Sequence, residues 1–258
     1  SFELRGRHIS SNRYVPMILP DGRSLHGIND ASIRIGLRLS KDETIVRMPF
    51  EVRHMGSKYP IFSFDFTGAK RGVLPASYDY LRLEGRMQYR LNLPPIGYSQ
   101  LMLEGGKIFG KVPYLLLKLH EGNGTYFYDR YAFSCMNFYE FSSDAWISFF
   151  YEHHFNGFLL GRVPLLKKLN WREVFVFKGV YGTLSARNDG SLPNTKAVML
   201  FPVGMSSVEH PYLETGFGIE NIFRLLRVDC IWRLTHHRAV PGLSIPTFTV
   251  NFSLNLKF

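Results

Sequence analysis

The sequence has no apolar run that approaches the roughly 20 residues a membrane-spanning helix requires. It has only two cysteines, Cys135 and Cys230, which are too few for a disulfide framework and fit no metal-ligand spacing. It also lacks a glycine-rich phosphate loop, a nucleophile elbow and a paired-cysteine redox motif. These absences exclude a helical membrane protein and several enzyme classes. If this chain spans a membrane, it does so with strands.

The chain begins at Ser1 without an initiator methionine and without a basic leader followed by an apolar core. We therefore expect that processing removed a leader or that residues 1–258 are the C-terminal part of a longer protein. The length suits one all-β unit, so we expect a single barrel domain over residues 1–258.

Residues 246–258 alternate apolar and polar side chains without a fault and end on an aromatic residue. This strand is about twice the usual length of about five or six residues, and a membrane-spanning strand needs about 9–11. A terminal phenylalanine on such a strand is the recognition signal of bacterial outer-membrane barrels. The predicted assembly signal is Phe248, Val250, Phe252, Leu254, Leu256 and Phe258.

The same period-two pattern recurs along the chain and predicts about twelve strands. The expected strands are 2–8, 31–40, 46–53, 62–67, 81–93, 98–107, 131–140, 145–153, 172–187, 212–220, 226–235 and 246–258. Short turns alternate with long connections, as in an up-and-down barrel whose long loops face outward. The predicted fold is all-β, an antiparallel up-and-down transmembrane barrel that is complete in itself or part of a larger one.

Charged side chains occupy one face of several of these strands. In a transmembrane barrel the apolar face meets lipid and the polar face points into the lumen, so these charges are predicted to fill the lumen. The predicted lumen charges are Arg82, Glu84, Arg86, Arg90, Arg227, Asp229 and Arg233. About eight strands leave a filled interior and 16–18 leave a water channel, so twelve would give an intermediate lumen.

One connection, residues 155–171, has apolar side chains at helical rather than strand spacing, with lysines and a tryptophan at its end. It is predicted to be a short helix that lies in the headgroup interface, or a loop helix that packs on the rim or plugs the lumen. The interfacial or partner-binding residues are His154, Phe155, Phe158, Leu159, Leu160, Arg162, Leu165, Leu166, Lys167, Lys168 and Trp171.

The net charge of +10 does not indicate nucleic-acid binding, because the basic residues are dispersed and interleaved with acids. Anionic lipid headgroups or lipopolysaccharide phosphates explain it more simply. The pairs His153–His154 and His236–His237 could suggest metal or hydrolase chemistry. Adjacent residues of a strand point to opposite faces, so neither pair chelates one ion from a regular strand. We expect no enzyme activity, metal or cofactor.

Four stretches of the sequence carry a family resemblance: residues 139–144 (YEFSSD), 151–169 (YEHHFNGFLLGRVPLLKKL), 211–222 (PYLETGFGIENI) and 227–229. The sequence from about residue 29 to the end resembles the C-terminal barrel of a Bacteroidetes outer-membrane family of unknown function. Members of that family typically carry an N-terminal carboxypeptidase-regulatory-like domain. The resemblance implies fold and location but no activity. A more distant similarity to BamA- and TamA-type assembly barrels is compatible with the sequence, but it shows no convincing counterpart of their arginine-containing lumen-loop motif, which argues against an insertase role.

Three functions are compatible with these patterns. The first is an outer-membrane barrel that acts as a structural or accessory subunit of an envelope complex for assembly, secretion or uptake. Its expected partners are outer-membrane lipids and lipopolysaccharide, the outer-membrane assembly machinery of a Gram-negative bacterium, and other envelope proteins. The second is a transport channel. The third, a soluble ligand-binding barrel, requires the apolar strand faces to point inward.

Overall fold

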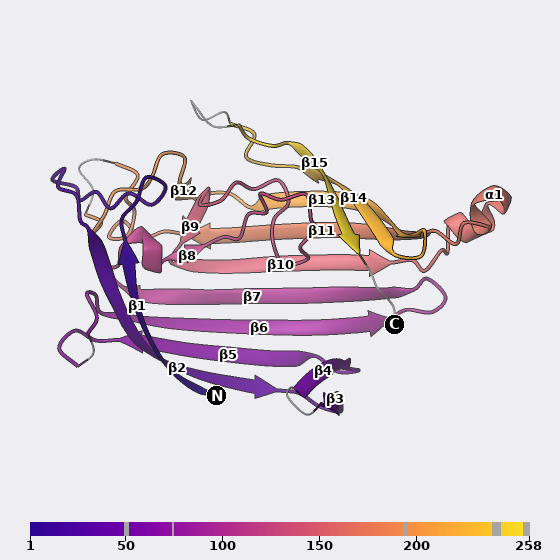
Figure 1. Cartoon of the computed structure of the whole chain (residues 1–258), viewed down its shortest axis with the longest axis horizontal. Helices are drawn as coiled ribbons and strands as arrows, with labels where there is room; N and C mark the ends of the chain where they lie inside the picture. The colour runs from indigo at the N-terminus through magenta and orange to yellow at the C-terminus, as the bar shows by residue number, and fades with distance from the viewer. Residues whose placement is uncertain (49–51, 74, 193–195, 239–243, 255–258) are drawn as a thin grey trace.

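A single large antiparallel sheet dominates the computed structural model, which describes residues 1–48, 52–73, 75–192, 196–238 and 244–254 (Figure 1). Each strand of this sheet pairs with the next one along the chain, as in a meander. In the described part of the chain it has ten strands, in the order β1 (Phe2–Ser10), β2 (Gly27–Leu39), β5 (Ile61–Ala69), β6 (Tyr80–Asn92), β7 (Tyr98–Gly110), β10 (Ala145–His154), β11 (Arg172–Thr183), β13 (Tyr212–Ile222), β14 (Leu226–Arg233) and β15 (Phe248–Leu254).

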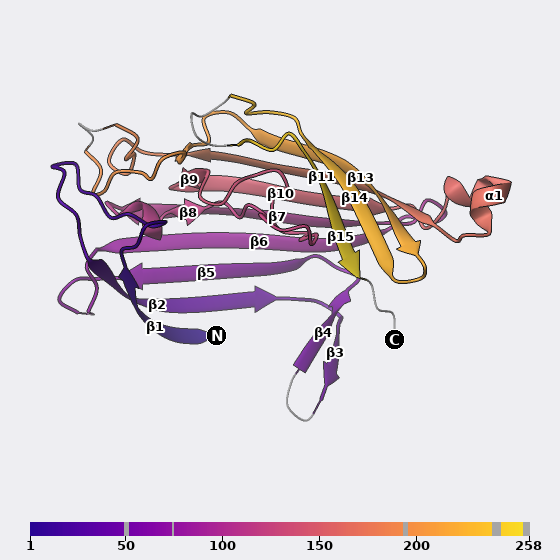
Figure 2. The same ribbon diagram turned by 45° about the horizontal axis from the view of Figure 1, so that its top comes forward.

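Smaller elements lie in the connections. The hairpin β3 (Glu43–Arg47) and β4 (Val52–Ser57) joins β2 to β5 and projects away from the main sheet (Figure 2). A small sheet contains β8 (Lys118–Leu119), β9 (Phe141–Ser143) and β12 (Ser206–Ser207). The 3-10 helices are η1 (Tyr114–Leu116) and η2 (Leu160–Arg162), and the α-helix is α1 (Pro164–Lys167). No helix in the described ranges is long and apolar enough to cross a membrane.

The two faces of the main sheet differ in chemistry because side chains alternate across each strand. One face, which we call the outer face, is apolar and open: Phe66, Ile147 and Phe217 are 46%, 48% and 60% exposed. The opposite face, the inner face, carries the polar set of the same strands, including Glu152, Lys178 and Asp229, all nearly inaccessible. The apolar outer face is open to the surroundings, whereas a soluble barrel turns the apolar faces of its strands inward.

The inner face is buried by the connections, chiefly by residues 111–144 between β7 and β10, which we call the internal segment. One apolar core includes Ile108, Val112, Tyr114 and Trp146. A second core joins Phe133 and other internal-segment side chains to inner-face residues of the strands: its members are Met102, Phe133, Met136, Phe141, Phe150, Val180, Val208 and Tyr212. The internal segment therefore folds back over the concave side of the sheet.

The two ends of the sheet differ in their connections. The long connections that follow β1, β5, β7, β11 and β14 join their strands at one end, which we call the long-loop end, and the internal segment extends from this end over the inner face. The other end, which we call the α1 end, has the short turns 93–97 and 223–225, the β3–β4 hairpin and the connection that contains α1 (Figure 1).

The edge strands β1 and β15 do not pair with each other in the described residues. Residues 125–128 of the internal segment run beside β15 instead, where the Tyr128 amide donates to the Phe252 carbonyl and the Phe252 amide donates to the Tyr126 carbonyl, both at 2.7 Å. The Asn251 side chain also donates to the Thr125 carbonyl at 3.0 Å. The internal segment thus covers part of the β15 edge.

The all-β antiparallel fold predicted from the sequence is confirmed, and ten of the twelve expected strands coincide with strands of the main sheet. Two predictions are wrong. Residues 131–140 belong to the internal segment and form no strand of the main sheet, because Phe133 and Met136 pack into the second core on the inner face. The expected strand 46–53 does not exist as one strand: β3 ends at Arg47 and β4 begins at Val52.

Candidate functional site

The internal segment is joined to the sheet by a buried ionic cluster centred on Glu152 of β10, whose side chain is 1% exposed. The Arg130 Nε donates to its carboxylate at 2.9 Å, and the Tyr128 hydroxyl donates to it as well. Burial lowers the pKa of Arg130, but the charge of Glu152 outweighs that effect and the net shift is upward. The guanidinium therefore stays charged, and the contact is a true ion pair.

Arg227 of β14 extends this cluster. Its Nη2 lies 3.2 Å from Glu152, and its Nε and Nη2 each donate to Asp229 at 2.8 Å. The Tyr128 ring is held by two cations, with Arg227 and Lys178 each 4.5 Å from its centroid. Burial and then Glu152 raise the pKa of the Tyr128 hydroxyl well above its ordinary value, so it remains a hydrogen-bond donor.

Two inner-face residues that the sequence analysis did not single out hold the backbone of the internal segment. The Lys178 ammonium donates to the carbonyls of Asp129 at 2.8 Å and Ala132 at 2.6 Å. The Glu214 carboxylate accepts from the amides of Ser134 at 2.8 Å and Cys135 at 2.7 Å. The sequence contains one sign of these two residues, which is a single charged residue at an inward-facing position of an otherwise apolar strand. The VFVFKGV run around Lys178 is an example.

The predicted lumen charges all lie on the inner face, but they form three groups. On β6, Arg82 pairs with Glu84 at 2.7 Å and Arg86 pairs with Glu104 of β7 at 2.6 Å, while Arg90 stacks over the Tyr98 ring at 4.1 Å. Arg227 and Asp229 belong to the Glu152 cluster. Arg233 lies at the long-loop end, where its fully buried side chain pairs with Glu140 of the internal segment.

The predicted interfacial segment leaves the sheet at the α1 end, and both views place α1 beyond the strand ends (Figures 1 and 2). Several of its apolar side chains are open, with Leu159 51% and Leu165 77% exposed. The plug alternative is therefore wrong. Arg162 lies 4.0 Å from the Phe158 ring. The same connection contains the other predicted interfacial residues that follow β10, which are Phe155, Leu160, Leu166, Lys167, Lys168 and Trp171.

His154 differs from the rest of that predicted set because it ends β10 on the inner face. Its ring stacks on Tyr98 with centroids 4.5 Å apart and contacts Glu152 at 3.3 Å and Glu220 at 3.2 Å. His153 points to the opposite face, where its Nδ1 lies 2.8 Å from the Ser99 hydroxyl. Among the residues described, no group of three or more His, Cys, Asp or Glu side chains is arranged to hold a metal ion.

The predicted assembly signal lies at the edge of the sheet. Phe248, Phe252 and Leu254 of β15 point to the outer face and are 47%, 39% and 59% exposed. Val250 shares that face. Leu256 and Phe258 lie outside the described residues.

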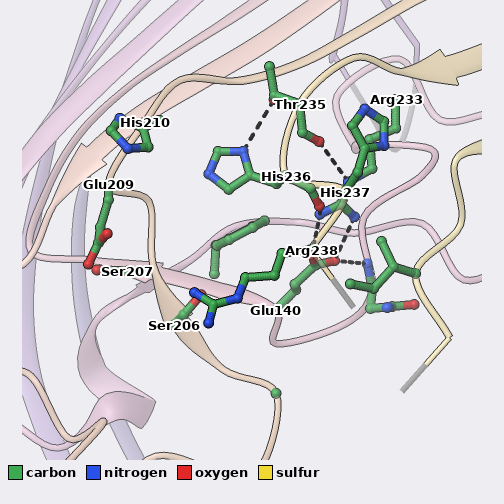
Figure 3. Close-up of a pocket in the computed structure, with 14 residues that line it drawn as sticks. Glu140, Ser206, Ser207, Glu209, His210, Arg233, Thr235, His236, His237 and Arg238 are labelled. Atoms are coloured by element: carbon green, nitrogen blue, oxygen red, sulfur yellow. Dashed lines mark hydrogen bonds and ion pairs between the residues drawn. The ribbon is translucent and has the colours of Figure 1, made fainter. Parts of the chain in front are cut away.

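A cavity of about 800 Å³, which we call the loop-end pocket, opens at the long-loop end (Figure 3). Three connections meet there, contributing Glu140 and Phe141, the β12 residues with Glu209 and His210, and residues 235–238 after β14. The Arg233–Glu140 pair forms part of its wall, with Nη2 to Oε1 at 2.5 Å. Burial, followed by the charge of Arg233, lowers the pKa of His236, so its ring is neutral at pH 7.

The comparisons with known proteins agree with this architecture. Residues 3–186 match the model of the C-terminal domain of a family of unknown function, DUF5686. The chain belongs to this family. A search of curated proteins finds no match for this DUF5686 chain.

Among solved structures, the DUF5686 chain is similar to BamA from Haemophilus ducreyi lacking POTRA domains 1–3, with a TM-score of 0.51 and 11% sequence identity. The similarity covers 92% of this chain and 45% of the BamA chain, so the DUF5686 chain spans less than half of that structure. At this identity the likeness establishes the fold alone: an antiparallel sheet like that of an outer-membrane β-barrel.

Proposed function

We propose that this protein is an integral outer-membrane β-barrel protein of a Gram-negative bacterium, of the Bacteroidetes type indicated by the sequence resemblance, and acts as a structural or accessory subunit of an envelope complex. The apolar outer face would meet lipid, and the long-loop end would face the exterior, where basic groups meet lipopolysaccharide phosphates. A carboxypeptidase-regulatory-like domain would precede it in the full protein. The assembly machinery would read the strand that ends at Phe258.

The observation that carries this proposal is the internal segment. A channel needs an open interior, but here two apolar cores and the Glu152 cluster join residues 111–144 to the inner face. Such a packed interior suits a barrel that works through its loops and its ends. We assign no catalytic role, because His153 and His154 lie on opposite faces of β10.

One observation favours transport as a second candidate. A cavity of about 1040 Å³ remains between the internal segment, the β3–β4 hairpin and strands β5, β6, β7 and β10, lined by Arg90, Arg130 and Tyr131 among others. If the internal segment withdrew, this space would widen into a passage.

Two measurements separate the candidates. Purification of the full-length protein from native outer membranes in mild detergent, with mass spectrometry of what accompanies it, should give partners in fixed stoichiometry. Planar-bilayer recordings of the same preparation should show no steady conductance. A barrel that purifies alone and conducts ions steadily would replace the first proposal with transport.

A further inference from the structure

The loop-end pocket has a wall whose geometry is fixed before any ligand arrives. Arg233 uses all five of its N–H groups within the protein. Its Nε donates to the Thr235 carbonyl at 3.0 Å, and its two Nη atoms donate to Glu140 and to the carbonyls of Cys135 and His236. The carbonyls of residues 235 and 236 both accept hydrogen bonds from this buried guanidinium. The backbone is therefore fixed two residues before Arg238.

Other polar groups of the pocket are uncommitted. Within the described part of the chain, the exposed Arg238 guanidinium has no acidic partner, and the hydroxyls of Ser206 and Ser207 make no hydrogen bond. A free guanidinium favours an anionic group. Hydroxyls that can both donate and accept suit a ligand that is itself rich in hydroxyls.

The pocket also offers an apolar surface. The half-buried ring of His236 lies at its side and packs edge-on against the buried Phe141 ring, with centroids 5.0 Å apart and planes at 72°. The open part of the His236 ring can pack against the C–H face of a sugar ring. Glu209 and His210 lie on the side away from Arg233 (Figure 3), where the carboxylate can accept further hydroxyl hydrogens. The volume of about 800 Å³ falls in the range of small-molecule sites and would hold a short saccharide.

We propose that the loop-end pocket binds an anionic saccharide, with Arg238 on its acidic group, the β12 hydroxyls on its ring hydroxyls and the His236 ring against its apolar face. A sugar acid and a sugar phosphate share this chemistry. The binding site goes beyond the proposed role as a complex subunit, because a barrel of either function can carry it.

Isothermal titration of the full-length protein in detergent with digalacturonate, glucose 1-phosphate and neutral maltose tests the proposal. At least one anionic probe should bind, and the two anions tell a carboxylate from a phosphate ligand. Arg238→Gln should weaken that binding about tenfold or more, as expected for loss of a charged hydrogen bond. Ser206→Ala should weaken it less. Maltose should bind at least about tenfold more weakly than the anion.

Arg224→Gln is the matched control, because Arg224 is also exposed but lies in the β13–β14 turn at the α1 end. It should leave the affinity unchanged. Equal affinity of Arg238→Gln and the parent protein, equal affinity for maltose, or no binding of either anion at about 10 mM would overturn the proposal. An unchanged melting temperature of Arg238→Gln shows that lost binding is not lost folding.

Discussion

Replacing Glu152 by glutamine should release the internal segment from the sheet while keeping the side-chain volume. The carboxylate lies between Arg130 at 2.9 Å and Arg227 at 3.2 Å, and its side chain is 1% exposed. Removing one partner of a buried ion pair costs about 3–5 kcal/mol, because the remaining charge stays buried. The Arg130 side chain is 36% exposed, so solvent screens part of its charge. The neutral amide also keeps some hydrogen bonds. We therefore expect Glu152→Gln to lower the free energy of unfolding by about 2–3 kcal/mol.

Equilibrium urea unfolding in detergent micelles measures this difference, and trypsin cleavage after Arg130 reports whether the internal segment has come loose. Both the loss of stability and faster cleavage are expected. Glu3→Gln is the control, because Glu3 also lies on the inner side of a strand but its pair with Arg5 is about half exposed. That change should cost less than about 1 kcal/mol. A Glu152→Gln protein as stable and as resistant to trypsin as the parent would refute the reasoning.

Three further predictions concern the loops, the α1 end and the C-terminus. Burial lowers the pKa of His120 to about 3, so between about pH 3 and 6.5 the unfolded chain binds a proton that the folded chain does not. The free energy of unfolding should therefore rise by about 2 kcal/mol from pH 4.5 to pH 7. Urea titrations should show a smaller rise for His120→Gln. Leu165→Asp should weaken contact of the α1 connection with the headgroup region, seen as loss of quenching of Trp171 by lipids brominated near the headgroup; equal quenching would count against an interfacial role. Deleting Phe258 should lower the amount of protein in the outer-membrane fraction without changing its strand content by circular dichroism, and normal levels would defeat the assembly-signal prediction.

The sequence predicted the sheet well because one physical signal, alternation of apolar and polar residues, governs each long strand. The run from Arg82 to Arg90 indicated both the strand β6 and the face that its charges share. The same signal misassigned residues 131–140, where Phe133 and Met136 pack into the core on the inner face and no strand of the main sheet forms. The period-two pattern of a segment cannot tell whether its apolar side chains are covered by the face of a sheet or belong to a strand that pairs with a neighbour.

The candidate sites were less predictable because they depend on contacts between residues far apart in the chain. Arg130 and Glu152 are separated by 22 residues, and Arg227 lies 75 residues beyond Glu152. Lys178 and Glu214 look like isolated charges until the internal segment is placed over them. Residues of three connections line the loop-end pocket, and no local sequence motif predicts that these connections meet.

The orientation of the sheet is best tested with the three tryptophans of the chain, Trp146, Trp171 and Trp232. Single-tryptophan variants are reconstituted into bilayers that contain lipids brominated near the headgroup. Trp232 lies on the outer face and is 41% exposed, so it should be strongly quenched. Trp146 lies on the inner face beneath the long loops and is 6% exposed, so its fluorescence should be unaffected. Quenching of Trp146 with Trp232 unaffected would mean that the apolar face does not meet lipid, and the membrane-barrel interpretation would fail.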